Sequence, residues 1–250
     1  MEFRIADAYE SNVAFTDFAN WLIPGSVMLG RYPYVEPSRC LRREQGEKQL
    51  QRILETGVTT FVSLQAELPP QDKMTLAGKN GFMPYKATAD LVRASLNGPP
   101  PMQIVEGLRN PSLDKFLPAR VSAAAAAAAA DAAGGWKRPG VEYNPVELQF
   151  CHSPIEDLGV PAEGALKGLI ADLESRLAAG EKLYVHCWGG RGRAGTVGAC
   201  LLASMYGLPA AECLERVQRA FDTRQDGGRR SPETEEQVAF VEGFVRALKH

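Results

Sequence analysis

The feature that most constrains the fold is a glycine-rich turn, residues 187–195, set between two apolar segments. The short run KLYVH (182–186) precedes it, and TVGACLLASMY (196–206), apolar on nearly all faces, follows it. The first run is typical of a buried strand, and the second of a helix in the middle of a protein. The chain is therefore expected to place a strand, a tight turn and a buried helix in direct succession.

The same turn carries reactive and anion-binding groups. Three glycines within four residues, Gly189, Gly190 and Gly192, let successive backbone N–H groups turn toward a common centre, to which the following helix points its positive end. Cys187 opens the turn and Arg193 closes it. We expect both the amides and Arg193 to stabilise a Cys187 thiolate, the nucleophilic form of cysteine. Because Arg193 also offers a planar fork to two phosphate oxygens, the turn predicts a phosphate site with an attacking atom.

A βαβ unit surrounds this turn. Alternating apolar and polar residues predict a strand over 146–151, which Pro154 ends. Apolar residues at helical spacing predict a helix over 163–178, with Gly180 as its C-terminal cap. Together with the strand at 182–186, these segments form a βαβ unit whose two strands should lie parallel and close together.

Further elements are expected on both sides of this unit. Helical spacing covers residues 209–221, and a last helix is predicted with Ser231 as its N-cap. Toward the amino terminus the pattern indicates a strand over 27–31, a helix that ends near Gly57 and a strand over 59–64.

The middle of the chain gives weaker signals. Prolines occupy positions 99–101, and eight alanines occupy 123–130. Alanine is the best helix former, but an all-alanine face has little to bury. We interpret residues 85–142 as an insertion that decorates one domain spanning 1–250. The alanine tract is then either a surface helix or disordered, and the functional alternative is a helix that binds a partner.

The βαβ unit also positions a proton donor. Loops after adjacent parallel strands emerge at one carboxyl edge of the sheet, where α/β proteins bind ligands. The segment SPIED, residues 153–157, should therefore lie on the same side of the sheet as Cys187. If the thiolate of the turn attacks a phosphate ester, the oxygen that leaves needs a proton, which a carboxylic acid can supply. Asp157 and Glu156 are the two candidates, and the other interpretation of Glu156 is a solvated loop charge.

Charge and cysteine usage exclude several classes of protein. Lys+Arg 28 against Asp+Glu 30 gives a net charge of −2, which predicts neither a nucleic acid nor an acidic membrane surface as partner. Five dispersed cysteines without a CxxC pair, and three histidines, argue against a disulfide framework and a structural zinc site. The first residues do not resemble a signal peptide, and no apolar run is as long as a membrane span. We expect a soluble intracellular, cytoplasmic protein that needs neither metal nor cofactor.

The string HCWGGRGRAGT, residues 186–196, resembles the Cys-x5-Arg signature of the cysteine-dependent protein tyrosine phosphatases. Within that superfamily it is most similar to the small dual-specificity enzymes, including the kinase-associated phosphatase group. The resemblance covers 146–248 and extends less closely to 26–64, but it does not cover the insertion. It implies an α/β fold with a central, mostly parallel sheet flanked by helices.

The resemblance also implies roles for residues. Cys187 would attack phosphorus and become a cysteinyl phosphate, which water then hydrolyses. Arg193 would hold the non-bridging oxygens together with the loop amides, and Asp157 rather than Glu156 would be the general acid. The residues expected to bind substrate through the loop are Trp188, Gly189, Gly190, Arg191, Gly192 and Ala194.

Four neighbouring residues each have two interpretations. His186 is similar to the histidine that orients the loop in the family, and it is equally a buried histidine at a strand end. Arg191 points either into solvent or toward substrate, where a second positive charge would favour a multiply anionic ligand. Trp188 either stacks on a substrate ring or forms a wall of the pocket. Gln237 is similar to a glutamine of the family's C-terminal segment, but we favour a position on a helix surface.

Ala194 departs from the family, which usually has Ser or Thr immediately after the arginine. That hydroxyl stabilises the cysteine thiolate as it leaves in the second step. Thr196, a supporting residue, lies two residues further along the chain and need not replace it. The departure implies slower hydrolysis of the intermediate.

Parts of the same sequence also fit other functions. Residues 190–195 match the dinucleotide fingerprint G-x-G-x-x-G, but 209–221 has helical periodicity where the second strand of a nucleotide-binding unit should stand. A phosphatase-like domain that captures phosphorylated partners with little turnover stays open because of Ala194. The expected substrate is a phosphorylated protein, with phosphotyrosine and phosphoserine or phosphothreonine all accepted. Phosphoinositide and phosphoglucan phosphatases of the same fold are the alternatives.

Overall fold

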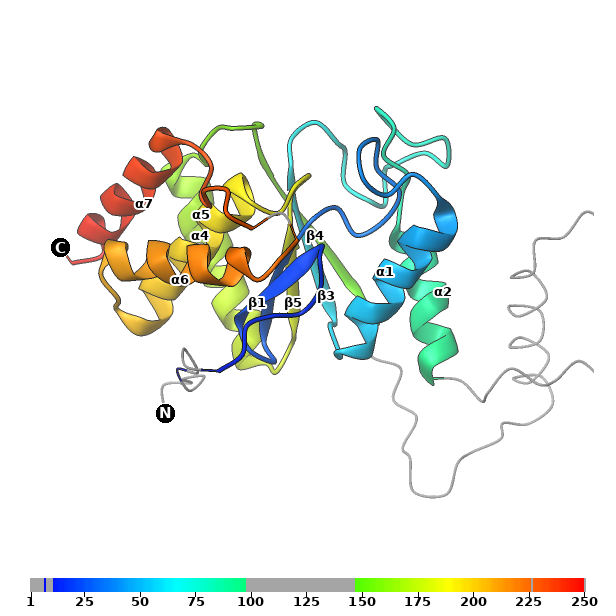
Figure 1. The fold of residues 1–250 in the computed structure, drawn as a ribbon, viewed down its shortest axis with the longest axis horizontal. Helices are drawn as coiled ribbons and strands as arrows, with labels where there is room; N and C mark the ends of the chain where they lie inside the picture. Colours follow the sequence, from blue (N-terminus) through cyan, green and yellow to red (C-terminus); the bar gives the residue numbers. More distant parts are fainter. Residues whose placement is uncertain (1–6, 8–10, 98–146, 226, 250) are drawn as a thin grey trace, which may run out of the picture.

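The computed structural model describes residues 7, 11–97, 147–225 and 227–249. Its strands and helices follow one another as β1 (Ala19–Ile23), β2 (Val27–Gly30), α1 (Arg43–Glu55), β3 (Thr60–Gln65), α2 (Lys86–Asn97), β4 (Gln149–Ile155), α4 (Glu163–Ala178), β5 (Leu183–His186), α5 (Gly192–Tyr206), α6 (Ala210–Asp222) and α7 (Glu235–Ala247). Figure 1 shows the sheet in the middle, with helices on both sides of it.

The described strands form one five-stranded sheet in the order β1-β2-β5-β3-β4. Only the β1–β2 pair is antiparallel, and β2, β5, β3 and β4 run parallel to one another. The predicted α/β fold with a central, mostly parallel sheet is therefore confirmed.

Each face of the sheet is covered by its own layer of helices. Helices α4 to α7 lie on one face and α1 and α2 on the other (Figure 1). Side chains on successive strand positions point to opposite faces, so Leu183 and Val185 of β5 join the core under α4 to α7, while Tyr184 joins the core under α1 and α2. All four β5 residues are buried, as expected for a strand covered on both faces.

The parallel strands bring four loops to one edge of the sheet. Gly30, His186 and Ser63 lie in register at the carboxyl ends of β2, β5 and β3, and His152 of β4 pairs with Ser63. The loops that follow these strands therefore emerge side by side. This is the edge at which α/β sheets bind ligands.

Two predicted boundaries were wrong. Strand β4 continues through Pro154 to Ile155, because β4 is an edge strand, where a missing N–H is tolerated. The last helix has Thr234, not Ser231, as its N-cap, because the Thr234 hydroxyl accepts the N–H of Gln237 in a capping box. Ser231 instead donates its hydroxyl to the carbonyl oxygen of Arg191, 2.9 Å away.

The predicted start of the insertion at residue 85 was also wrong. Tyr85 and Ala89 are fully buried, and α2 packs beside α1 on the sheet. Residues 85–97 thus belong to the core of the fold. The remainder of the proposed insertion, including the alanine tract 123–130, lies outside the described residues.

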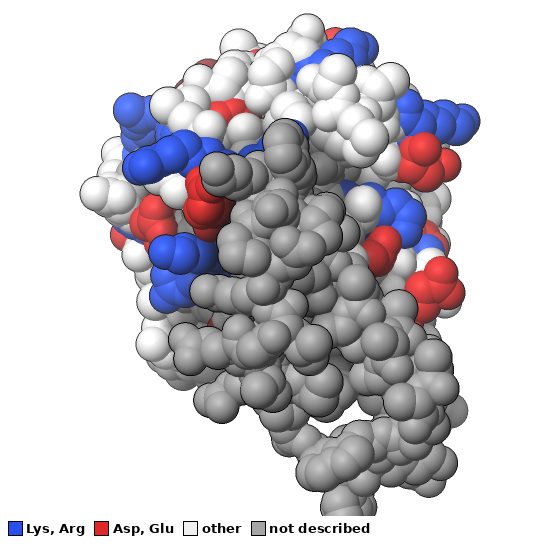
Figure 2. Space-filling view, turned by 90° about the vertical axis from the view of Figure 1, so that its right-hand side faces the viewer, with Lys and Arg blue, Asp and Glu red and all other residues white. Residues whose placement is uncertain are grey.

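Figure 2 views the molecule from the right-hand side of Figure 1. On the described part of this surface, basic and acidic side chains are interspersed. This distribution agrees with the net charge of −2. No helix among residues 11–97, 147–225 and 227–249 has the length and apolar character needed to cross a bilayer.

Candidate active site

The glycine-rich turn lies between β5 and α5, as predicted, but the helix starts earlier than expected. Helix α5 begins at Gly192, so Arg193 stands in its first turn. Gly190 has φ +66, and its N–H points at the Sγ atom of Cys187, 3.2 Å away. A Cβ at Gly190 would lie 2.2 Å from the carbonyl carbon of Gly30, so only glycine fits where the turn crosses β2. The turn thus presents a backbone donor and a helix N-terminus to the thiol.

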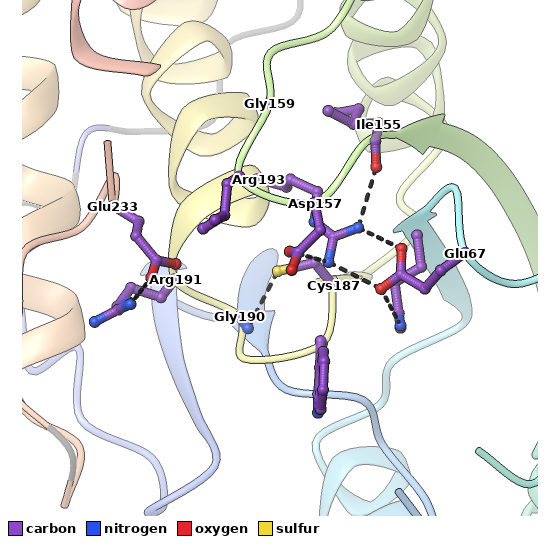
Figure 3. Close-up of polar contacts among 12 residues, drawn as sticks. Glu67, Ile155, Asp157, Gly159, Cys187, Gly190, Arg191, Arg193 and Glu233 are labelled. Atoms are coloured by element: carbon purple, nitrogen blue, oxygen red, sulfur yellow. Dashed lines mark hydrogen bonds and ion pairs between the residues drawn. The ribbon is translucent and has the colours of Figure 1, made fainter. Parts of the chain in front are cut away.

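Arg193 is buried and held by a carboxylate that the sequence analysis missed. Glu67 accepts from Nη1 at 2.7 Å and from Nη2 at 3.0 Å, and the Ile155 carbonyl oxygen accepts from Nη1 at 3.0 Å (Figure 3). Burial alone would raise the pKa of Glu67, but its hydrogen bonds, of which those from Arg193 come first, and the charge of Arg193 together outweigh burial, and the pKa lies below its ordinary value. The bidentate pair fixes the plane of the guanidinium.

The position of Glu67 in the sequence does indicate its place in the fold. It follows the strand predicted over 59–64, and the loop after a parallel strand reaches the same edge as the turn at Cys187. The rule that placed Asp157 near Cys187 therefore applies to Glu67 as well.

Asp157 lies at the mouth of the same site, as predicted. Its Oδ1 atom is 2.8 Å from Nη2 of Arg193, and its side chain is 55% exposed. Figure 3 shows Asp157, Arg193 and Cys187 close together. Glu156 is exposed and does not line the pocket, which fits a solvated loop charge.

These groups line one pocket of about 240 Å³. Cys187, Trp188, Gly189, Arg191, Gly192, Arg193 and Asp157 come from the predicted set, and Ser38, Arg39, Leu158, Arg229, Glu233 and Gln237 complete the lining. Gly190 and Ala194 do not line it. Gly190 packs against the backbone of Gly30, and Ala194 is fully buried in the core under α4 to α7.

The side chains of Trp188 and Arg191 each have a carboxylate partner. The indole Nε1 of Trp188 donates to Glu36 Oε2 at 2.8 Å, and its ring meets Phe82 edge-on at 5.4 Å. Both contacts hold the Trp188 ring in place beside the pocket. Arg191 forms an ion pair with Glu233, which offsets part of its positive charge at the pocket (Figure 3).

His186 is completely buried at the end of β5. Its Nε2 atom lies 2.8 Å from the Tyr85 hydroxyl, and its Nδ1 atom lies 3.4 Å from the carbonyl oxygen of Cys187. Burial lowers the pKa of His186 to about 3, so the ring is neutral. The two interpretations of His186 coincide, because this buried histidine contacts the backbone of the turn.

Gln237 is buried, so the predicted helix-surface position was wrong. Its Oε1 atom accepts the N–H groups of Glu233 and Thr234, and its Nε2 atom donates to the carbonyl oxygen of Gly159 at 3.0 Å. It lies inside because it completes the capping box of α7. It also ties that helix to the loop that carries Asp157.

Thr196 and the remaining cysteines do not line the pocket. The Thr196 hydroxyl donates to the carbonyl oxygen of Gly192 at 2.9 Å, so it does not replace the hydroxyl that Ala194 lacks. Burial raises the pKa of each of the other four thiols, none of which lines the pocket, namely Cys40, Cys151, Cys200 and Cys213.

Comparison with known proteins gives matches in sequence and in fold. Residues 138–241 match the family model described as "PTP-SAK: Swiss Army Knife protein, DSP-PTPase phosphatase domain". The uncharacterized protein MJECL20 of Methanocaldococcus jannaschii is 31% identical over 107 residues, which are 42% of this chain. The match spans 65% of the length of that curated relative.

Among solved structures, a mutant form of Tk-PTP is 20% identical, with a TM-score of 0.52 over 93% of this chain and 97% of the other. The crystal structure of PTPMT1 in complex with PI(5)P is 13% identical, with a TM-score of 0.49 over 93% of this chain and 97% of the other. At these identities the likeness concerns the fold alone. The sequence match is limited to residues 138–241, which are similar to the DSP-PTPase phosphatase domain and make up less than half of the chain.

Proposed function

We propose that this protein hydrolyses phosphate monoesters through a cysteinyl-phosphate intermediate and that its substrates are phosphorylated proteins. The observation that carries the proposal is the convergence of three groups on one pocket. The Sγ atom of Cys187 accepts the N–H of Gly190, Arg193 is oriented by Glu67, and Asp157 lies at the mouth of the pocket. Thiolate, guanidinium and carboxyl groups are those that covalent phosphoryl transfer requires.

In the first step the Cys187 thiolate attacks phosphorus and the bond from phosphorus to the leaving oxygen breaks. Asp157 donates a proton to that oxygen, which leaves as a phenol or alcohol. The negative charge stays on the three non-bridging oxygens, where Arg193 and the loop amides stabilise it. Asp157 lies within ion-pair distance of Arg193. An oxygen of a phosphate bound by this guanidinium is therefore within reach of the Asp157 carboxyl group.

In the second step water attacks phosphorus, the Asp157 carboxylate takes a proton from it, and the phosphorus–sulfur bond breaks. Inorganic phosphate and the thiolate are released. The N–H of Gly190 stabilises the departing thiolate, while Ala194 supplies no hydroxyl to assist. We therefore propose that breakdown of the intermediate limits turnover.

Apart from the attacking water, both steps use only side chains and backbone amides of this chain, and the proposed mechanism needs no cofactor. The same groups would serve a phosphoinositide or phosphoglucan phosphatase, or a domain that binds phosphoproteins with little turnover. We favour a dual-specificity protein phosphatase from the family match. The five free cysteines of the chain favour a reducing, intracellular compartment.

The test compares hydrolysis of phenyl phosphate by the wild type and by matched pairs of variants. We expect Cys187→Ser to lose at least about 10³-fold in kcat, whereas Cys151→Ser, a substitution away from the pocket, keeps it. Asp157→Asn should lose about 10²- to 10⁴-fold, and Glu156→Gln, its exposed neighbour, should lose little. Activity that survives in Cys187→Ser would rule out the covalent mechanism.

A panel of substrates then separates the alternatives. Phosphotyrosine and phosphoserine peptides, a phosphoinositide headgroup and a phosphoglucan are compared by kcat/KM at equal concentrations. Tight binding of a phosphopeptide without release of phosphate would favour the binding domain. A kcat/KM for the headgroup or the glucan far above that of both peptides would replace the protein substrate.

A further inference from the structure

Glu36 is a buried carboxylate on the loop between β2 and α1, outside the segment that matches the family. It is 2% exposed, and it accepts five hydrogen bonds. Four come from its own loop, from the backbone N–H groups of Ser38, Arg39 and Cys40 and from the Ser38 hydroxyl. The fifth comes from the indole Nε1 of Trp188, 2.8 Å away. One carboxylate thus closes its own loop and ties that loop to the phosphate-binding turn.

The two segments that Glu36 connects form one side of the pocket. Trp188 and Arg39 both line the pocket, and Nη1 of Arg39 lies 4.0 Å from the position that a Cβ of Gly189 would occupy. The indole is 36% exposed and rests edge-on against Phe82 at an interplanar angle of 77°. It is therefore held from two directions while part of it faces the space above the turn.

The charge on Glu36 is maintained although the residue is buried. Burial by itself raises the pKa of Glu36, but the hydrogen bonds from Ser38, Trp188 and Arg39 outweigh it, and the pKa lies below its ordinary value. A buried carboxylate is costly unless its oxygens are fully hydrogen-bonded. All five of these bonds organise the rim of the pocket, and none of them goes to Cys187, Arg193 or Asp157.

We propose that Glu36 is a positioning residue that makes the pocket prefer aryl over alkyl phosphate monoesters, by holding the Trp188 indole where the ring of the substrate lies. This inference rests on the proposed function and names the substrate class of the same site. A fixed indole gains ring contacts with an aryl ester and loses no side-chain freedom when the ester binds. An alkyl ester has no ring that could contact the indole.

Two variants test the proposal. In Glu36→Gln the amide oxygen can still accept the N–H groups of Arg39 and Cys40, but the amide NH₂ then faces the N–H groups of Ser38 and Trp188, so the bonds from both are lost. Trp188→Phe keeps an aromatic ring and removes the donor. Each variant should lower the ratio of kcat/KM for phenyl phosphate to that for O-phosphoserine about two- to tenfold, mainly through KM for the aryl ester.

The double variant distinguishes a shared mechanism from two separate losses. If Glu36 acts through Trp188, the two changes together lower the ratio no further than either one alone. The inhibition constant of inorganic phosphate, which has no organic part, should stay unchanged in all three variants. Tryptophan emission, taken as the difference from Trp188→Phe, should shift to longer wavelength in Glu36→Gln as the freed indole meets water.

Binding of phosphonates separates this inference from the proposed function. Phenylphosphonate and methylphosphonate are not hydrolysed, so the ratio of their dissociation constants, measured by calorimetry, reports aryl preference without turnover. Glu44→Gln, an exposed change on α1, is the matched control and should leave the ratio unchanged. An unchanged ratio in Trp188→Phe overturns the inference even if Glu36→Gln does not fold. Equal weakening of both phosphonates and of inorganic phosphate also overturns it, since Glu36 would then support only the scaffold.

Discussion

The carboxyl edge of the sheet receives different groups from the two parts of the chain. The part after residue 147 supplies Cys187, Arg193 and Asp157, which are proposed to touch the phosphate. The part before residue 98 supplies Glu67 and Glu36, which hold Arg193 and Trp188. The first part lies largely within the family match, and the second lies outside it. Reactive groups and the groups that orient them are thus encoded far apart in the sequence and meet only because β3 and β2 lie on either side of β5.

If the two parts divide the work in this way, the largest loss of activity in the amino-terminal part is expected from a change of Glu67. We expect Glu67→Gln to lower kcat for phenyl phosphate about 10- to 100-fold, because a neutral amide cannot hold the Arg193 guanidinium through two charge-assisted hydrogen bonds. KM should change less, since the loop amides still bind the phosphate. Steady-state kinetics across a range of substrate concentrations gives both constants.

The control is Glu55→Gln, an exposed change at the end of α1. It should leave kcat intact, and thermal unfolding of both variants shows whether a loss reflects folding. A Glu67→Gln enzyme with wild-type kcat would mean that Arg193 is oriented by its own turn alone. In that case the amino-terminal part would not be needed to orient Arg193.

Local sequence patterns predicted most elements of the carboxyl-terminal part. They did not predict the residues of the amino-terminal part that orient its site residues. The helix over 163–178 and the strand at 182–186 were predicted closely, because alternating and helical patterns were unbroken there. Helix α2 was missed, although Ala89 and Val92 are buried at helical spacing, because prolines and weak patterns surround it. Glu36 carried no local signal. Its role depends on a contact with Trp188, 152 positions away in the chain, that only the folded sheet creates.

His186 of the carboxyl-terminal part contacts Tyr85 of the amino-terminal part, and its burial between them makes the free energy of unfolding depend on pH. The pKa of His186 is about 3 in the folded protein because the ring is buried, against about 6.5 in an unfolded chain. Below pH 6.5 the unfolded state therefore binds a proton that the folded state does not, and the free energy of unfolding falls as the pH falls. Between pH 7.5 and 5.5 this residue should remove about 1.4 kcal/mol of stability.

The measurement is denaturant unfolding of the wild type and of His186→Asn at both pH values. The variant is expected to be less stable at each pH, but it should lose about 1.4 kcal/mol less than the wild type between them. Tyr85→Phe, which keeps the histidine and removes the hydroxyl 2.8 Å from it, should retain the pH dependence. Equal losses in the wild type and His186→Asn would mean that the ring gains protons freely in the folded state.

The smallest effect is expected at Arg39, on the exposed rim of the amino-terminal part. Arg39 is solvent-exposed and lines the pocket beside the turn, so its charge acts through water on any anion next to the scissile phosphate. Arg39→Ala should raise KM about two- to threefold for a phosphotyrosine peptide with aspartate beside the phosphotyrosine. For the same peptide with alanine in that place KM should change less.

Salt and a neighbouring arginine give the controls. At about 0.5 M NaCl the difference between the two peptides should largely vanish, because exposed charges are screened over distances of a few ångströms. Arg42→Ala removes another exposed charge from the same loop but outside the pocket lining, and it should not distinguish the peptides. If Arg42→Ala and Arg39→Ala raise KM alike, the rim acts through its overall charge and not through the placement that Glu36 imposes. A difference that persists at high salt would instead point to a direct, desolvated contact between Arg39 and the acidic side chain.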